Sequence, residues 1–150
     1  MGIRYARISG KLYESQLKDI DAGLKSFFDN SAAKMTKERY LMMKEQLGEE
    51  PDMKECPPDY EDFPYDVQVA INIYHILPDV WLEFSGTYAG KSYAILPYLM
   101  DEIYEVANKR VTMQYILMIN NIIVDIRSKE QKQRQQRAKS KGKKGINIQG

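Results

Sequence analysis

The chain has 150 residues, of which 43% are hydrophobic and 11% aromatic, and its net charge is +1. This length suits one domain with a modest core, and the composition excludes an intrinsically disordered chain. No run of about 18 apolar residues occurs and the first residues lack the apolar segment of a secretion signal, so we expect neither a membrane span nor secretion. The single cysteine, Cys56, fits a reducing cytosol, and we expect a cytoplasmic protein.

The first half of the chain predicts two amphipathic helices and a linker. Residues 11–29 place apolar side chains at steps of three and four, which is the period of a helix with one apolar stripe. Residues 34–47 repeat the pattern, and Gly48 predicts the end of that helix because glycine adopts the left-handed conformation at little cost. Residues 49–64 contain four prolines among acidic side chains, which predicts an extended acidic linker.

The second half predicts three more helices. The first covers residues 66–77 and ends at a Pro-Asp pair. The second covers residues 92–107, with Ser92 as its N-cap and Pro97 near its first turn. The third covers residues 110–126 and is strongly apolar. Residues 80–91, which lie between the first two, do not favour one type of element.

These elements predict an all-α fold with one domain of about five helices. The domain is expected to span residues 1–126, including the acidic Pro-rich linker, and a basic tail to span residues 127–150. We expect residues 127–138 to extend the last helix, Gly142 and Gly145 to end regular structure, and the final residues to be loose.

Two segments of opposite charge stand out. Residues 45–66 carry nine acidic side chains against Lys54, whereas residues 127–144 carry nine basic side chains against Glu130. The basic set can contact nucleic-acid phosphates or an acidic partner, or remain solvated, and the sequence leaves these alternatives open. Its lack of aromatic residues predicts binding without base stacking. The opposite charges also predict self-association between the two blocks or clamping within one chain. The predicted contact residues are Arg127, Lys129, Lys132, Arg134, Arg137, Lys139, Lys141, Lys143 and Lys144.

The segment SGTYAGKSYAIL resembles part of a phosphate-binding loop. Gly90, Lys91 and Ser92 match the second half of the pattern G-x-x-x-x-G-K-[ST], but Ser85 replaces its first glycine. The helical spacing after this point leaves no room for the parallel sheet that such a loop needs. We therefore interpret the segment as a bend with a solvated Lys91. An ATP-binding protein is a distant alternative, and anion binding at these three residues without hydrolysis is a further prediction.

Other chemistry is weakly indicated. His75 is the only histidine, so no zinc site is specified. Cys56 lies among acidic residues, which raise the pKa of a thiol and disfavour a nucleophile. Paired carboxylates occur, but no pattern indicates a pocket that would tune them. The sequence predicts no catalytic residue, no metal site and no cofactor, and thus a protein that is not an enzyme.

The middle of the chain, roughly residues 47–107, shows a resemblance in LGEEPDMKECPPDYEDFPYDVQVAINIYHILPD and GTYAGKSYAILPYLMDEIYEV. An acidic Pro-rich segment, a helix closing on Leu-Pro-Asp and a Gly-Lys turn before another helix resemble small helical accessory proteins of tailed bacteriophages. Tail-assembly chaperones and small hub or connector proteins are the most similar kinds. The resemblance implies a chaperone-like protein that is not an enzyme and acts on virion proteins in the host cytoplasm or within the virion. It assigns no functional residues.

The sequence thus favours a structural or assembly factor that binds other proteins, with the opposite charge blocks and the methionine and tyrosine content as its motivation. The alternative is a protein that binds nucleic acid without sequence specificity through residues 127–144.

Overall fold

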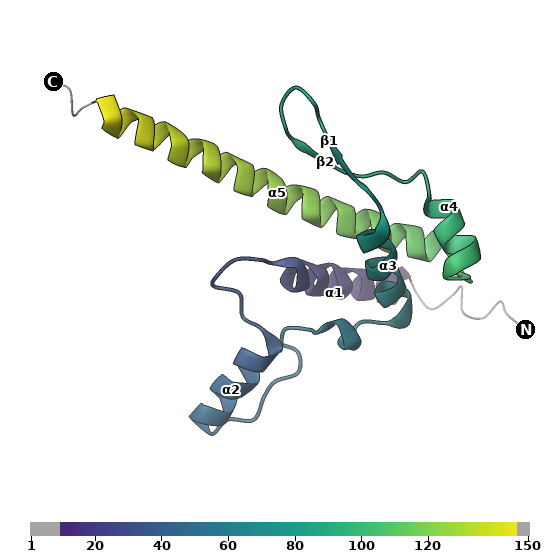
Figure 1. The fold of residues 1–150 in the computed structure, drawn as a ribbon. Coiled ribbons are helices and arrows are strands. Elements are labelled where there is room, and N and C mark those ends of the chain that lie inside the picture. Colours follow the sequence, from purple (N-terminus) through teal and green to yellow (C-terminus); the bar gives the residue numbers. More distant parts are fainter. Residues whose placement is uncertain (1–9, 147–150) are drawn as a thin grey trace, which may run out of the picture. The chain divides into compact units, whose positions relative to one another are not determined.

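The computed structural model describes residues 10–146 of the chain, and the side chains of residues 15–144. By its internal contacts the chain divides into two compact units, residues 1–69 and 70–150. The elements are α1 (Gly10–Phe28), α2 (Lys37–Leu47), a 3₁₀ turn (Tyr60–Asp62), α3 (Tyr65–Ile76), β1 (Asp79–Trp81), β2 (Tyr88–Lys91), α4 (Leu96–Tyr98), a π-helical turn (Leu99–Ile103) and α5 (Lys109–Ile146) (Figure 1). The predicted boundary between a helical domain at residues 1–126 and a tail at residues 127–150 stays a prediction.

The described residues are mostly helical, but the all-α prediction is wrong for the segment that connects α3 to α4. There β1 and β2 form a two-stranded antiparallel hairpin. Leu82 N donates to Thr87 O at 2.8 Å, and Gly86 N donates to Leu82 O at 2.8 Å. Gly86 holds a positive φ of 63°, which a residue without a Cβ adopts at little cost. This turn brings the two strands together.

In the first unit, α1 packs through its C-terminal end. Phe27 lies edge-on to Phe28 and to Phe63, with ring centroids 5.1 and 5.5 Å apart. Gly23 lies against the same Phe63 ring, since a Cβ at Gly23 would be 3.2 Å from Phe63 Cε1. Lys34 Nζ donates to Phe27 O at 2.7 Å and so satisfies one of the last carbonyls of α1.

The helix α2 has well-formed ends. Thr36 caps it by accepting a hydrogen bond from Arg39 N at 3.2 Å, and Gly48 ends it with a φ of 67°, as predicted. Tyr40 is its one buried residue, and the Tyr40 hydroxyl bonds both the backbone N–H and the carbonyl of Asp52 at 3.1 Å. The linker is thus tied to α2, and Lys37 adds an ion pair to Asp62 at 2.8 Å.

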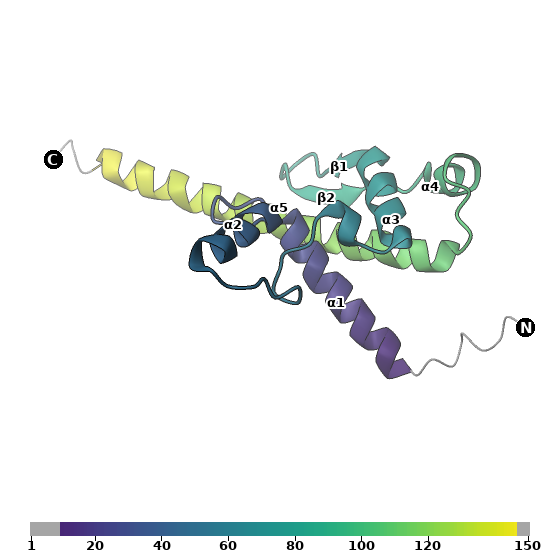
Figure 2. The ribbon, with the colours of Figure 1, turned by 90° about the horizontal axis from the view of Figure 1, so that it is seen from below.

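In the second unit, α5 carries the main apolar stripe. Its buried positions recur at helical spacing and are Thr112, Tyr115, Ile116, Ile119 and Ile122. The hairpin and α4 lie along the N-terminal half of α5, while its C-terminal half extends beyond the rest of this unit (Figures 1 and 2). A helix of 38 residues is about 57 Å long.

Two predicted boundaries in this unit are wrong. Ser92 does not cap a helix over residues 92–107, because the helical segment covers only Leu96–Ile103 and Ile95 is in its N-cap position. Instead, Ser92 N donates to Pro78 O at 2.8 Å. Pro97 does lie in its first turn. Gly142 and Gly145 do not end α5, which continues to Ile146, since one glycine in a helix costs only about 1 kcal/mol. The predicted loose end, residues 147–150, lies outside the described residues.

Candidate functional site

The hairpin is fixed in place by a small polar network. The Asp79 carboxylate accepts a hydrogen bond from the Tyr88 hydroxyl at 2.8 Å. It also forms an ion pair with Lys91 Nζ at 3.1 Å. The Tyr88 hydroxyl also lies 3.4 Å from the hydroxyl of Tyr74, a buried residue of α3. Lys91 Nζ lies 4.9 Å from the centre of the Tyr74 ring, within range of a cation–π interaction. The network joins both strands to α3.

The charges in this network shift the pKa values of its members. Burial alone would raise the pKa of Asp79, but the hydrogen bonds from Tyr88 and Lys91, with the positive charges of Lys91 and Arg127, outweigh it and lower the pKa. Burial raises the pKa of both tyrosines, Tyr74 and Tyr88, so both hydroxyls stay protonated at neutral pH. The network therefore contains the ionised carboxylate of Asp79, whose negative charge is balanced by Lys91 and Arg127.

The lowered pKa of Asp79 predicts a loss of stability in acid. Such a carboxylate stabilises the fold above its unfolded pKa of 3.8, and the contribution disappears as the pH falls through the folded value. At pH 7 we expect Asp79→Asn to lower the free energy of unfolding by about 0.5–1 kcal/mol, a small value because the carboxylate is 40% exposed. The variant and the wild type should converge once the pH has fallen through the folded pKa of Asp79, which lies below 3.8.

Denaturant unfolding at neutral and acid pH measures this difference. Asp125→Asn is the matched control, because the Asp125–Lys129 pair is 63% and 70% exposed and should contribute almost nothing. Equal stability of Asp79→Asn and the wild type at pH 7 would contradict the prediction.

The second strand is docked on α5 through one close contact. Gly90 has a φ of 105°, and a Cβ there would be 2.8 Å from Asn120 Oδ1. The same Asn120 oxygen accepts a hydrogen bond from Lys91 N at 3.1 Å. Glycine at this position thus lets the strand reach the half-buried Asn120 side chain. The sequence did not predict a contact between Gly90 and Asn120. The available signal was the pair Asn120 and Asn121, two polar residues within a strongly apolar helix, which could have indicated a polar contact there.

Gly90 and Lys91 therefore belong to β2, and Ser92 directly follows this strand, so the segment is not a bend before a helix. The prediction that Lys91 is solvated is wrong, because its side chain is only 10% exposed and pairs with Asp79. Lys91 N is bonded to Asn120, and Ser92 N to the carbonyl of Pro78. The two strands are antiparallel, and residues 10–146 contain no parallel sheet. Anion binding at this segment stays a prediction, in competition with these internal contacts.

The hairpin also carries an aromatic and cationic cluster, which shares Tyr88 with the polar network. Trp81 and Tyr88 meet edge-on with ring centroids 5.0 Å apart. The Arg127 guanidinium of α5 lies 4.5 Å from the Tyr88 ring centre and 5.6 Å from that of Trp81. These contacts place Arg127, a predicted contact residue, against the hairpin.

This cluster borders an open hollow of about 260 Å³. The hairpin contributes Trp81, Gly86 and Tyr88 to its lining, and α5 contributes Arg127, Glu130, Gln131 and Arg134. Trp81 is 51% exposed, whereas Tyr88 is 6% exposed. The indole is therefore the aromatic surface of the hollow that a ligand can reach.

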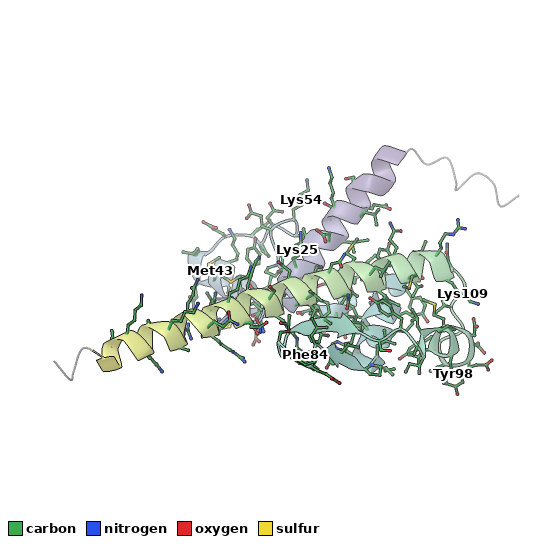
Figure 3. The ribbon with its side chains drawn as sticks, turned by 90° about the horizontal axis from the view of Figure 1, so that it is seen from above. Lys25, Met43, Lys54, Phe84, Tyr98 and Lys109 are labelled. Atoms are coloured by element: carbon green, nitrogen blue, oxygen red, sulfur yellow. The ribbon has the colours of Figure 1, made fainter. Side chains whose placement is uncertain are left out.

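The remaining predicted contact residues lie along the C-terminal half of α5. All nine basic side chains between residues 127 and 144 are exposed, and Lys129 pairs with Asp125 at 2.9 Å. Figure 3 shows side chains projecting from both sides of this part of the helix. An exposed helix with cations on all sides can contact several phosphates or carboxylates at once.

Other residues considered for chemistry are scattered. Cys56 is half-buried in the linker and His75 is exposed on α3. Among residues 10–146, no three His, Cys, Asp or Glu side chains are grouped so as to hold a metal ion. In the same range, no helix combines the length and apolar character needed to cross a membrane.

Comparison with protein-family models, with curated proteins and with solved structures found no match for this chain.

Proposed function

We propose that this chain is a structural or assembly factor that acts by binding another protein, not by catalysis. The observation that carries the proposal is the surface of α2. Of its 11 residues only Tyr40 is buried. Its large apolar side chains are exposed at 38% for Leu41, 52% for Met42, 37% for Met43 and 63% for Leu47.

Such a helix gains little from its own packing. An isolated helix of this length is marginal in water, and most helical stability in proteins comes from burying an apolar face. Exposed apolar patches on folded proteins mark interaction surfaces, and methionine adapts its shape to a partner. Met43, labelled in Figure 3, is one of these side chains.

The acidic charge of the first unit indicates what kind of partner surface would fit it. Nine acidic side chains lie within residues 45–66, which begin in the last turn of α2, and Met53 and Tyr65 in this segment are 68% and 76% exposed. A protein that presents apolar side chains flanked by basic ones would complement this surface. With the resemblance to phage accessory proteins, we propose a virion component as this partner, in the cytoplasm of an infected cell.

Photo-crosslinking in the native cells tests the proposal. We expect a photo-reactive residue in place of Met42 to give one crosslinked protein species, and one in place of Gln16, which is exposed on α1, to give much less. Leu47→Asp should weaken the complex about 10- to 100-fold, since burying one large apolar side chain contributes about 1.5–3 kcal/mol. Equal or absent crosslinking from both positions would refute a specific surface on α2, and a crosslink to a second copy would indicate self-association.

A second candidate function rests on the exposed basic half of α5. The 18 residues from Arg127 to Lys144 cover about 27 Å of helix and carry nine cations. We propose that this segment binds the phosphates of a nucleic acid, with release of counterions and strong dependence on salt.

Charge removal tests this second candidate. We expect the double change Lys139→Gln and Lys141→Gln to weaken binding to an oligonucleotide about tenfold. The slope of log affinity against log salt should fall by about one for each lost contact. The matched control is Lys18→Gln with Lys54→Gln, two exposed lysines of the first unit. Equal affinity of both double variants would contradict phosphate binding by α5.

A further inference from the structure

We infer that the hollow between the hairpin and α5 is a stacking site for one base of a single-stranded nucleic acid, with Trp81 as the platform. This inference rests on the second candidate function and deepens it, because it names the kind of nucleic acid and the side chains that hold a base. The sequence alone predicted binding without stacking, since residues 127–144 contain no aromatic side chain.

The geometry brings an aromatic surface to the start of the basic helix. The half-exposed indole of Trp81 and the guanidinium groups of Arg127 and Arg134 line one hollow. Stacking on an aromatic ring is a sequence-tolerant way to bind a base, because every base has a flat face. The hollow also contains Glu130, so its two arginines leave a net positive charge that favours a phosphate.

Arg127 is already held in position. Its guanidinium lies 4.5 Å from the ring centre of Tyr88 and 5.6 Å from that of Trp81. Contact with two rings restricts a long side chain that would otherwise lose conformational entropy on binding. Arg127 is thus placed to contact the phosphate of a nucleotide whose base lies on the indole.

The size of the hollow favours one nucleotide unit over a large cofactor. Its volume of about 260 Å³ is below the range of roughly 300–1,000 Å³ that encloses drug-sized ligands. From Arg127 the cations continue to Lys144, 17 residues or about 26 Å along α5. A strand with one base in the hollow can therefore place its following phosphates against the cations of this half of α5.

The same arrangement disfavours a duplex. The bases of a duplex are stacked on one another, so a duplex can contact the cations of α5 but cannot place a base on Trp81. Phe84, at the end of the hairpin, is fully exposed, and its side chain is labelled in Figure 3. It offers a second exposed ring on the hairpin. Leu82, also exposed on the hairpin, has no flat face to offer and serves as the control.

The experiment uses Trp81 itself, which is the only tryptophan of the chain, as a fluorescent reporter. The full-length protein is titrated with a 12-nucleotide oligo-dT, with a 12-base-pair duplex and with polyglutamate. We expect the single strand to quench the tryptophan fluorescence on binding, and the duplex to bind without quenching.

Substitutions give a second measurement by fluorescence anisotropy of a labelled oligo-dT. Trp81→Ala should weaken binding about 5- to 150-fold, Trp81→Phe should restore part of this loss, and Leu82→Ala should leave the affinity unchanged. Where the alanine variant does not fold, the quenching measured on the wild-type protein still tests the inference, because it requires no substitution.

The outcomes separate the inference from the function on which it rests. Salt-dependent binding of oligo-dT without quenching, and with equal affinity for Trp81→Ala, Leu82→Ala and the wild type, would overturn the stacking site but leave phosphate binding intact. No binding of either nucleic acid would overturn both. Equal quenching by polyglutamate would assign the hollow to an acidic protein segment and would overturn the inference.

Discussion

Gly90→Ala is expected to destabilise the second unit by about 2–4 kcal/mol. A φ of 105° costs a residue with a Cβ about 1–3 kcal/mol. The new Cβ would also be 2.8 Å from Asn120 Oδ1, so the Asn120 side chain must move away. Its hydrogen bond to Lys91 N would then be lost, at a further cost of about 0.5–1.5 kcal/mol.

Gly86→Ala is the matched control for this prediction. Gly86 also has a positive φ, 63°, but nothing lies within 4 Å of the position of its Cβ. We expect a loss of only about 1 kcal/mol for the left-handed conformation. Urea unfolding followed by Trp81 fluorescence reports on the hairpin in both variants. Equal losses for Gly86→Ala and Gly90→Ala would show that the contact with Asn120 contributes nothing.

Ile116→Ala is expected to lower the free energy of unfolding by about 2–5 kcal/mol. Ile116 is fully buried on the apolar stripe of α5, so the change removes buried methyl groups and leaves a cavity. The adjacent Leu117 is 42% exposed, and Leu117→Ala should cost less than about 1 kcal/mol. Both changes introduce alanine into the same helix, so a difference in helix propensity contributes little to the difference between the two stability losses. Similar losses measured by urea unfolding would contradict the predicted core.

Much of the helical part of the fold could be predicted from local patterns. The spacing of apolar residues identified α1, α2, α3 and the apolar half of α5, and Gly48 ended α2 as predicted. These features depend on residues within one or two turns of each other, so the sequence contains the information directly. The extent of α5 was underestimated, because two exposed glycines were given more weight than their small cost warrants.

The hairpin and the segment after it were harder to predict. Three- and four-residue strands are too short to show a clear alternation of apolar and polar side chains. Gly90 and Lys91 matched a phosphate loop by spacing, although their roles in the structure are contact with Asn120 and pairing with Asp79. Asn120 lies 30 positions after Gly90 and 29 after Lys91, and Asp79 lies 12 positions before Lys91. Contacts between residues this far apart in the chain are beyond the reach of a local pattern.

The candidate sites also combine features that follow from local sequence with contacts that only the folded chain creates. The sequence by itself determined the positions of α1, α2, α3 and the apolar half of α5, and of the acidic and basic blocks, because each follows from neighbouring residues in one segment. Only the tertiary structure decided that Lys91 is neutralised within the fold and that Trp81 meets Arg127 at the start of the basic block. The physical reason is that a hairpin must fold back onto α5 before residues 46 positions apart can share one surface, and only the packed chain specifies that contact.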